Sequence, residues 1–269
     1  MSDAITTRKA QTRAMFNRIA EGYDMAGPGC FAHFGKRLVE VADIKPGQRV
    51  LDVATGRGAA LFPAATQVGP SGEVTGIDLA EEMVRIAREE GARRELNIDV
   101  QVMDAEQLDF PDASFDRVLC GFGVMFFPRL DLALTEIHRV LKPGGQLAIS
   151  TWRVSQGDDL ATVLGELGFA DLSADPAVAF SQPDAVERPL LTAGFSSVET
   201  QVDSTTFHYT DIEEYWQNAR GTGMRRWLDA LSTDQIEQTK TAFVSRTQPQ
   251  TRPDGIYLDA TALLAVATR

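Results

Sequence analysis

The residues best suited to chemistry in this sequence are two glycines and two carboxylates, each placed after a short apolar run. They are Gly56, Gly58, Asp78 and Asp104. Glycines let a ligand approach backbone N–H groups closely, and a carboxylate can accept hydrogen bonds from two neighbouring ribose hydroxyls. A strand, a glycine-rich turn, a helix and a second strand ending in an acid form half of a nucleoside-binding βαβ unit. We therefore expect Asp78 to hold a ribose and Asp104 to face an adenine amino group.

The spacing within the turn excludes two common kinds of nucleotide site. A dinucleotide fingerprint reads G-x-G-x-x-G, and Leu61 stands where its third glycine should be. We expect Leu61 to hold the following helix away from the strand. A phosphate-binding loop needs Gly-Lys-Ser/Thr after the turn, and the sequence has no such tripeptide there. The turn thus offers backbone N–H groups and room for a ligand, without a dedicated cradle for pyrophosphate.

Four motifs in order along the chain resemble the class I S-adenosylmethionine (SAM)-dependent methyltransferases. The first motif of that family resembles VLDVATGRG, with glycine usual where Ala54 stands. The acidic ribose motif of the family resembles VTGIDLAEEMV, in which Asp78 is the acid. The other two stretches are VMDAEQLDFPDASFDRVLCGFGVMFF and EIHRVLKPGGQLAIS. The resemblance covers residues 16–152 and has the character of the ubiquinone/menaquinone-biosynthesis type of small-molecule methyltransferase.

The resemblance implies SAM as the cofactor and S-adenosylhomocysteine as the product formed from it. It implies that Gly56 and Gly58 approach the methionine portion, that Asp78 holds the ribose, and that Asp104 or Ala105 meets the adenine. Asp52 either reaches the cofactor ammonium through water or only braces the turn. The residues expected to bind the cofactor are Tyr23, Asp52, Thr55, Gly56, Gly58, Asp78, Leu79, Met83, Asp104, Ala105 and Cys120.

Tyr23 and Cys120 take particular places in this scheme. Tyr23 matches a tyrosine common near the start of related enzymes, and its ring would favour the cationic methionine end. The alternative for Tyr23 is an aromatic side chain that anchors a helix. Cys120 ends the fourth strand-like run, where the methyl group should emerge, and we expect it to form a buried wall.

The methyl acceptor is expected to bind among aromatic side chains, some of which belong to the core. The candidates are Phe122, Phe126, Trp152, Tyr215 and Trp216, with Phe127 and Trp227 nearby in the same pattern. Such side chains suit a flat or prenylated acceptor in an apolar pocket. Methyl transfer from a sulfonium needs no metal, and none is expected. His33 and His208 are candidate bases for an acceptor that loses a proton, the alternative being packed or solvent-facing histidines.

Composition narrows the class of partner. The chain has 269 residues and a formal net charge of −12, which argues against nucleic acid because phosphates require a basic footprint. It has two cysteines, Cys30 and Cys120, which form neither a disulfide framework nor a C-x-x-C pair. A polar N-terminus and the lack of a long apolar run predict a cytoplasmic protein with no membrane partner. A homodimer is left open.

The pattern of elements predicts a doubly wound, Rossmann-like α/β sheet of seven strands. The resemblance implies that the last strand is antiparallel and lies between the fifth and sixth. We divide the chain into an N-terminal helical cap (1–46), a SAM-binding core (47–152) and a remainder (153–269) that starts irregularly. Capping boxes at Thr210 and Ser232 predict two helices. These helices lie in a segment of about 211–250 between the last two strands, which we interpret as a substrate lid.

The predicted function is SAM-dependent methylation of a small, partly hydrophobic metabolite. The resemblance favours C-methylation in quinone-type or secondary-metabolite biosynthesis. The alternatives are an O- or N-methyltransferase, a regulator that binds SAM without turnover, and a nicotinamide oxidoreductase. Amide and exocyclic base targets are disfavoured, because the chain lacks an Asn/Asp-Pro-Pro-Tyr-like tetrapeptide after the fourth strand-like run.

Overall fold

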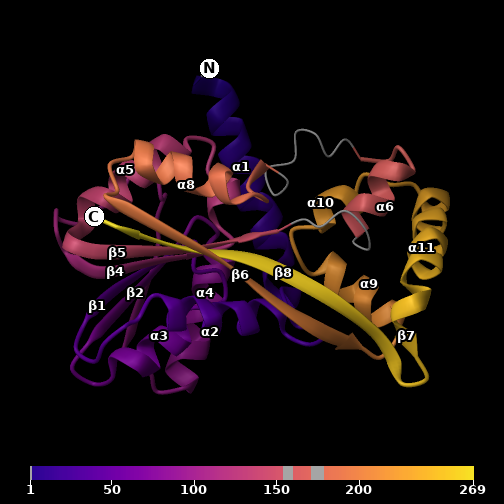
Figure 1. Cartoon of the computed structure of the whole chain (residues 1–269), viewed down its shortest axis with the longest axis horizontal. Helices are drawn as coiled ribbons and strands as arrows, with labels where there is room; N and C mark the ends of the chain where they lie inside the picture. Colours follow the sequence, from indigo (N-terminus) through magenta and orange to yellow (C-terminus); the bar gives the residue numbers. More distant parts are fainter. Residues whose placement is uncertain (1, 154–159, 171–178) are drawn as a thin grey trace.

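The computed structural model describes residues 2–153, 160–170 and 179–269 of the chain (Figure 1). Its strands form one sheet in the order β3-β2-β1-β4-β5-β8-β6, with β7 paired to β8 off this path. The strands are β1 (Arg49–Val53), β2 (Glu73–Asp78), β3 (Ile98–Val102), β4 (Phe115–Gly121), β5 (Leu141–Trp152), β6 (Ser197–Tyr209), β7 (Thr251–Arg252) and β8 (Gly255–Thr268). Strands β1 to β5 pair in parallel, whereas β8 is antiparallel to both neighbours.

This topology confirms the predicted doubly wound sheet, including the antiparallel last strand between the fifth and sixth. The described part of the chain adds one strand to the predicted seven, because two-residue β7 folds back on the start of β8. Strand β3 lies at the edge of the sheet, where Val100 is buried and Val102 is 47% exposed. The topological switch point lies between β1 and β4, which is where open α/β sheets bind ligands.

Helices cover both faces of the sheet. Figure 1 shows α2, α3 and α4 on one face and α5 and α8 on the other. The α-helices are α1 (Ser2–Ile19), α2 (Cys30–Val41), α3 (Leu61–Val68), α4 (Glu81–Arg93), α5 (Leu130–Val140), α6 (Leu160–Glu166), α8 (Pro183–Thr192), α9 (Ile212–Arg220), α10 (Arg225–Leu228) and α11 (Thr233–Thr247). The 3-10 helices are η1 (Ala20–Gly22), η2 (Val124–Phe126) and η3 (Gln248–Gln250). Each face has its own apolar core, so the sheet is buried from both sides.

The N-terminal segment and the region after β6 are helical, as the sequence predicts. Helices α9, α10 and α11 lie between β6 and β8, at the end of the long β6–β8 ribbon (Figure 1). The capping box at Ser232 is present, with the N–H of Gln235 donating to the Ser232 hydroxyl. The first cap differs from the prediction: Asp211, not Thr210, accepts from the N–H of Glu214, because Thr210 itself donates to the Glu214 carboxylate.

Two local predictions need correction. The stretch after Trp152 contains α6 where irregular chain was expected; the rest of that stretch lies largely outside the described residues. Leu61 does not hold α3 away from the sheet, since its side chain is fully buried. Gly76 on β2 makes the room: a Cβ at Gly76 would lie 3.0 Å from Leu61 Cδ1. The missing third glycine of the turn is therefore replaced by a glycine on the neighbouring strand.

Candidate active site

The glycine-rich turn after β1 has left-handed backbone at three positions. Gly56 has φ +54°, Gly58 has φ +95°, and Ala54 has φ +56° although it carries a Cβ. A left-handed conformation costs an alanine roughly 1–2 kcal/mol relative to glycine. Gly123 accommodates the extra methyl group, because a Cβ on Gly123 would lie 2.7 Å from the Ala54 Cβ. The alanine at a usual glycine position is thus compatible with the turn.

Asp78 ends β2 with its carboxylate beside this turn. The N–H of Gly56 donates to Asp78 Oδ2 at 2.9 Å, and the N–H of Ala80 donates to Oδ1 at 2.9 Å. Burial raises the pKa of Asp78 above its usual value, and these backbone donors oppose the rise. Each oxygen keeps a further lone pair for a ligand. The carboxylate is therefore fixed in position and able to accept from two ribose hydroxyls.

Asp52 lies one strand away and is almost completely buried, at 1% exposed. Thr55 Oγ1 donates to Asp52 Oδ2 at 2.6 Å, which ties the strand to the turn. Burial raises the pKa of Asp52 to about 7, and Asp78 adds to the rise while Thr55 opposes it. Asp52 lines neither of the two cavities described below, so its contacts favour the bracing alternative. Thr55 lines the second of those cavities.

The first cavity runs along the carboxyl ends of the strands from Asp104 to the loop after β4. Nine of the residues predicted to bind cofactor or acceptor line it together: Tyr23, Gly56, Asp78, Leu79, Met83, Asp104, Ala105, Phe122 and Phe126. The Phe127 ring lies there as well. Cys120 does not line either cavity, because its side chain is fully buried in the core between the sheet and α5. The strand ends therefore gather the predicted set, with Cys120 behind it.

Helix α1 closes the Asp104 end of this cavity with residues that sequence reasoning missed. Lys9 Nζ donates to Asp104 Oδ2 at 2.6 Å and also pairs with Glu106. Burial opposes a charge on Lys9, but these two carboxylates outweigh it and raise the pKa of Lys9. Lys9, Arg13 and Phe16 line the cavity at helical spacing. This repeating spacing was the available signal, although it does not identify the surface that the helix covers.

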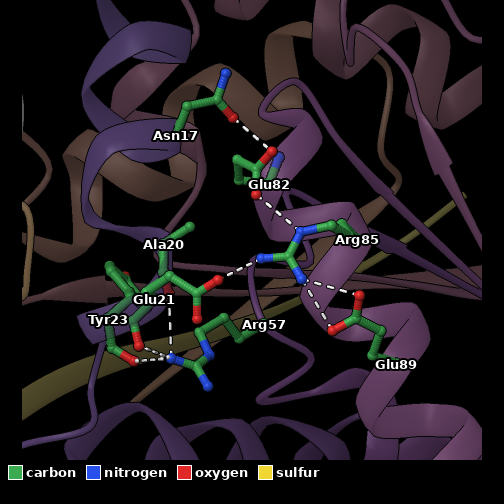
Figure 2. A network of polar contacts seen from close by, with 8 residues as sticks. All are labelled: Asn17, Ala20, Glu21, Tyr23, Arg57, Glu82, Arg85 and Glu89. Atoms are coloured by element: carbon green, nitrogen blue, oxygen red, sulfur yellow. Dashed lines mark hydrogen bonds and ion pairs between the residues drawn. The ribbon is translucent and has the colours of Figure 1, made fainter.

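Two arginines fasten the end of α1 and the following turn to the core, as Figure 2 shows. Arg57 in the glycine-rich turn donates to the carbonyl oxygens of Ala20 at 3.1 Å and Glu21 at 2.7 Å. Arg85 on α4 binds the carboxylates of Glu82 and Glu89 and also pairs with Glu21. The segment that carries Tyr23 is therefore held over the glycine-rich turn.

Tyr23 lies where the two cavities meet. Its ring stacks on Phe31 with centroids 5.1 Å apart, and both cavities include it in their walls. Burial raises the pKa of the Tyr23 phenol well above its usual value, with further contributions from Asp24 and Asp78. The phenol is thus neutral near physiological pH and lies near both carboxylates. The role of Tyr23 at the cationic methionine end of the cofactor stays a prediction.

Aromatic side chains form a wall beside the loop after β4. Phe122 has φ +53° and stacks on Trp152 with ring centroids 4.1 Å apart. Phe31 packs edge-on against both rings, at 5.4 Å from Phe122 and 5.8 Å from Trp152. Phe126 meets Phe16 edge-on at 5.0 Å. The structure therefore brings Phe122, Phe126 and Trp152 to the same region, together with Phe31, which the sequence did not single out.

The other predicted acceptor residues lie in the C-terminal helical region. Tyr215 stacks on Phe243 with centroids 4.5 Å apart. Trp216 is 2% exposed, and neither side chain lines the two cavities. Trp227 packs beneath Arg226, whose guanidinium carbon is 4.3 Å from the ring centroid. These rings serve the apolar core in this structure, and their role toward an acceptor stays a prediction.

Neither candidate histidine lines the two cavities. His33 packs edge-on against Phe34 and Phe207, and its Nε2 is buried and has no hydrogen-bond partner in the part of the chain that the structure describes. His208 lies at the far end of β6, where its Nε2 is 2.9 Å from the carbonyl oxygen of Asp254. Packing against aromatic rings thus positions the His33 imidazole, and a contact with the turn at Asp254 positions the His208 imidazole. Their role as bases stays a prediction without support from the geometry.

A second cavity adjoins the first and contains a carboxylate that sequence reasoning missed. Asp24, Phe31 and Gly121 line it, together with Tyr23 and Gly56 from the first cavity. Asp24 follows Tyr23 directly, within the stretch 22–29 of the N-terminal cap, which is rich in glycine. An acid next to a predicted ligand-binding tyrosine was the signal that could have found it. Within the described ranges, no three His, Cys, Asp or Glu side chains gather as a metal site requires.

Comparison with known proteins places these features in context. Residues 50–145 match the model of a methyltransferase domain. The chain is 42% identical over 144 residues to an aklanonic acid methyltransferase of Streptomyces sp. strain C5, covering 53% of this chain and 66% of that protein. It is 37% identical over 202 residues to a nocamycin O-methyltransferase of Saccharothrix syringae, covering 68% of this chain and 72% of that protein.

A third relative and a solved structure extend the comparison. The chain is 36% identical to a ubiquinone/menaquinone biosynthesis C-methyltransferase of Hydrogenovibrio crunogenus, covering 52% of this chain and 57% of that protein. The crystal structure of the YcgJ protein of Bacillus subtilis resembles this fold with a TM-score of 0.62 at 20% identity, covering 88% of this chain and 98% of that one. The similarity thus spans 57% to 72% of the length of these three relatives.

Proposed function

The chain belongs to the class I SAM-dependent methyltransferases, and on that premise we propose that it methylates a small, partly hydrophobic metabolite. The observation that carries this proposal is the meeting of two cavities at the carboxyl ends of β1 and β4. Tyr23, Ala54, Gly56 and Gly121 line both cavities. A cofactor in the first cavity and an acceptor in the second would meet at these residues.

The residues of the first cavity fit the cofactor. Asp78 would hold the ribose, and Leu79 and Met83 would pack against the adenine. A Cβ at Gly56 would meet no atom within 4 Å, so the space beside that backbone is free for the methionine portion. SAM supplies a methyl group activated by a sulfonium leaving group. The chain supplies alignment: Tyr23 and Phe122 cover the meeting point, and the aromatic wall excludes water from it.

The relatives narrow the class of acceptor. Two are named for aklanonic acid and nocamycin, and a third is named for quinone biosynthesis. The aromatic wall of Phe31, Phe122 and Trp152 suits a flat, partly apolar molecule of that kind. We propose a secondary-metabolite or quinone-type acceptor, with carbon as the predicted methylated atom and oxygen as the alternative.

The test combines binding with product analysis. Calorimetry should detect S-adenosylhomocysteine binding to the wild-type chain, and mass spectrometry should find an isotopic label moved from methyl-labelled SAM to a phenolic or enolic metabolite. Fragmentation of the product separates methylation at carbon from methylation at oxygen. Cofactor binding without transfer to any tested acceptor would favour a regulator that binds SAM. Preferential binding of NAD would instead revive the oxidoreductase alternative.

The remaining expectations on partners are proposals as well. In the part of the chain that the structure describes, no helix is both long enough and apolar enough to cross a bilayer. We propose a cytoplasmic location, an acceptor free in solution and no nucleic-acid partner. Light scattering of the purified chain would show whether it forms a homodimer.

A further inference from the structure

The Asp24 carboxylate, which lies beside the aromatic wall, is only partly hydrogen-bonded within the described part of the fold. Asp24 lies in the turn between η1 and α2, with a left-handed φ of +55°. Phe31 N donates to Asp24 Oδ2 at 3.2 Å, and the first N–H groups of α2 face this carboxylate. Asp24 Oδ1 is buried and has no hydrogen-bond partner among the described residues. A buried acceptor atom without a partner is unfavourable and calls for an explanation, which the place of Asp24 in the wall of a cavity offers.

The position of Asp24 connects it to the methyl-transfer region. It lines the second cavity together with Tyr23, Gly56 and Gly121, and these three residues also line the first. Phe31, whose N–H binds the carboxylate, places its ring against Phe122 and Trp152. Phe31 itself lines the second cavity, so an acceptor lying on this ring would have the Asp24 carboxylate at one edge and the cofactor cavity at another.

The electrostatic surroundings suit a group that exchanges a proton. Burial raises the pKa of Asp24 to about 6, while the N–H groups of α2 and the guanidinium of Arg57 oppose the rise. The other titratable groups facing it are Tyr23, Cys30 and Tyr209, whose pKa values are all raised by burial. These three groups are neutral near pH 7. Asp24 would be largely ionised there and remain basic enough to take a proton.

The other titratable groups near the site are less suitable. Asp52 is held by Thr55 behind the turn, and both oxygens of Asp78 bind backbone N–H groups. Glu90 also lines the second cavity, but it pairs with Arg93 and Arg94. His33 and His208 line neither cavity. Asp24 therefore lines the cavity and has one oxygen that accepts no hydrogen bond from the described residues.

We propose that Asp24 accepts a proton from the methyl acceptor, and that the acceptor carries an ionisable hydroxyl group, as a phenol or an enol does. This inference rests on the methyltransferase function proposed above. The O–H proton moves to the Asp24 carboxylate, and the electron pair left on the acceptor forms the new bond to the methyl carbon, either from oxygen or through the conjugated carbon. The carbon–sulfur bond breaks with its pair on sulfur. For attack through carbon, the proton on that carbon leaves afterwards to solvent.

The decisive variant is Asp24→Asn. Asparagine tolerates left-handed backbone, and its amide oxygen can still accept from Phe31 N, so the fold of the loop is retained. Calorimetry should give a S-adenosylhomocysteine affinity within twofold of wild type. The turnover of a weakly acidic phenol should fall on the order of 10²- to 10⁴-fold, the usual contribution of a positioned base.

Acidity of the acceptor supplies a second readout. The wild-type rate should rise with pH through an apparent pKa near that of Asp24 and then level off, and Asp24→Asn should lose this rise. In a series of phenols of decreasing pKa, the turnover of Asp24→Asn should progressively approach that of wild type, because an acceptor that is already ionised needs no base. NMR titration of ¹³C-labelled aspartate, with Asp24→Asn identifying the signal, should give a pKa well above the usual value for aspartate.

Three results would overturn the inference. Asp24→Asn could retain wild-type turnover and pH dependence for every phenol in the series. It could instead lose S-adenosylhomocysteine binding, which would make Asp24 a cofactor ligand. The NMR titration could also give an ordinary aspartate pKa. If the wild-type chain bound no S-adenosylhomocysteine and methylated no acceptor, the proposed function itself would fail, which is a separate outcome from any of these.

Discussion

The cofactor side and the acceptor side of this site are positioned by different parts of the structure. On the cofactor side, Gly56 lies in the turn after β1 and Asp78 ends the adjacent parallel strand β2, and the Gly56 N–H donates to the Asp78 carboxylate. On the acceptor side, Phe31 from α2 lines the second cavity and packs against Phe122 from the loop after β4 and Trp152 from the end of β5. Backbone geometry determines the first arrangement, whereas side-chain packing between distant elements determines the second. Substitutions should therefore affect the two sides separately.

The largest effect is expected from Asp78→Ala, which changes the cofactor side of the site. Loss of the carboxylate removes charged hydrogen bonds worth about 1–3 kcal/mol, which corresponds to a roughly 5- to 150-fold weaker S-adenosylhomocysteine affinity. Calorimetry measures this change, and urea unfolding measures the accompanying cost of the unpaired Gly56 and Ala80 N–H groups. Asp78→Asn is the matched control, since it keeps one acceptor oxygen. Unchanged affinity in Asp78→Ala would contradict the ribose assignment.

The next largest effect is expected from Gly123→Ala, which changes the packing between the glycine-rich turn and the loop after β4. A Cβ at Gly123 would lie 2.7 Å from the Ala54 Cβ and 2.8 Å from Cys120 Sγ. Gly123→Ala should therefore lower the free energy of unfolding by about 1–3 kcal/mol through overpacking. Ala54→Gly in the same chain should restore part of this loss, because it removes one of the two close contacts. Additive effects in the urea-unfolding cycle would show that the two residues do not compensate each other.

The acceptor side is tested by Trp152→Ala. Trp152 lines neither cavity, so it acts on the acceptor through the Phe31 and Phe122 rings that it packs against. Loss of this packing, worth about 0.5–1.5 kcal/mol, should raise the acceptor KM by at most roughly 12-fold. S-adenosylhomocysteine affinity should stay within twofold of wild type, since Trp152 does not line the first cavity. Trp152→Phe serves as the control that keeps an aromatic ring. A loss confined to cofactor affinity would break the distinction between the two sides.

The smallest effect is expected at the helix that closes the cofactor side. Lys9 bridges Asp104 and Glu106, and its side chain is 23% exposed. Partly exposed ion pairs contribute about 0.2–1 kcal/mol, so Lys9→Met should accelerate S-adenosylhomocysteine dissociation up to roughly 5-fold in stopped-flow measurements. Arg8→Met, an exposed neighbour on α1, should leave the dissociation rate unchanged. Equal dissociation rates in wild type, Lys9→Met and Arg8→Met would show that Lys9 of α1 does not restrain the ligand.

Much of the fold and of the cofactor side could be predicted from the sequence. Strand ends in a parallel sheet converge at one edge, so residues such as Asp78 and Asp104 are placed by their position after each strand. The resemblance to the methyltransferase family also implied the place of the last strand, β8, between β5 and β6. The accommodation of Ala54 by Gly123 and of Leu61 by Gly76 was not predictable, because each pair joins different segments through van der Waals contact.

The sequence by itself determined the sheet, the glycine-rich turn and the carboxylate one strand away, since local periodicity and turn chemistry fix all three. Tertiary structure alone decided which side chains share a cavity. In the tertiary structure Lys9 binds Asp104, and Asp24 lies beside the aromatic wall. His33 and His208 lie outside both cavities. The reason is physical: a helix pattern defines an apolar face but not the surface that this face will cover. Side chains far apart along the chain meet only when packing brings their elements together.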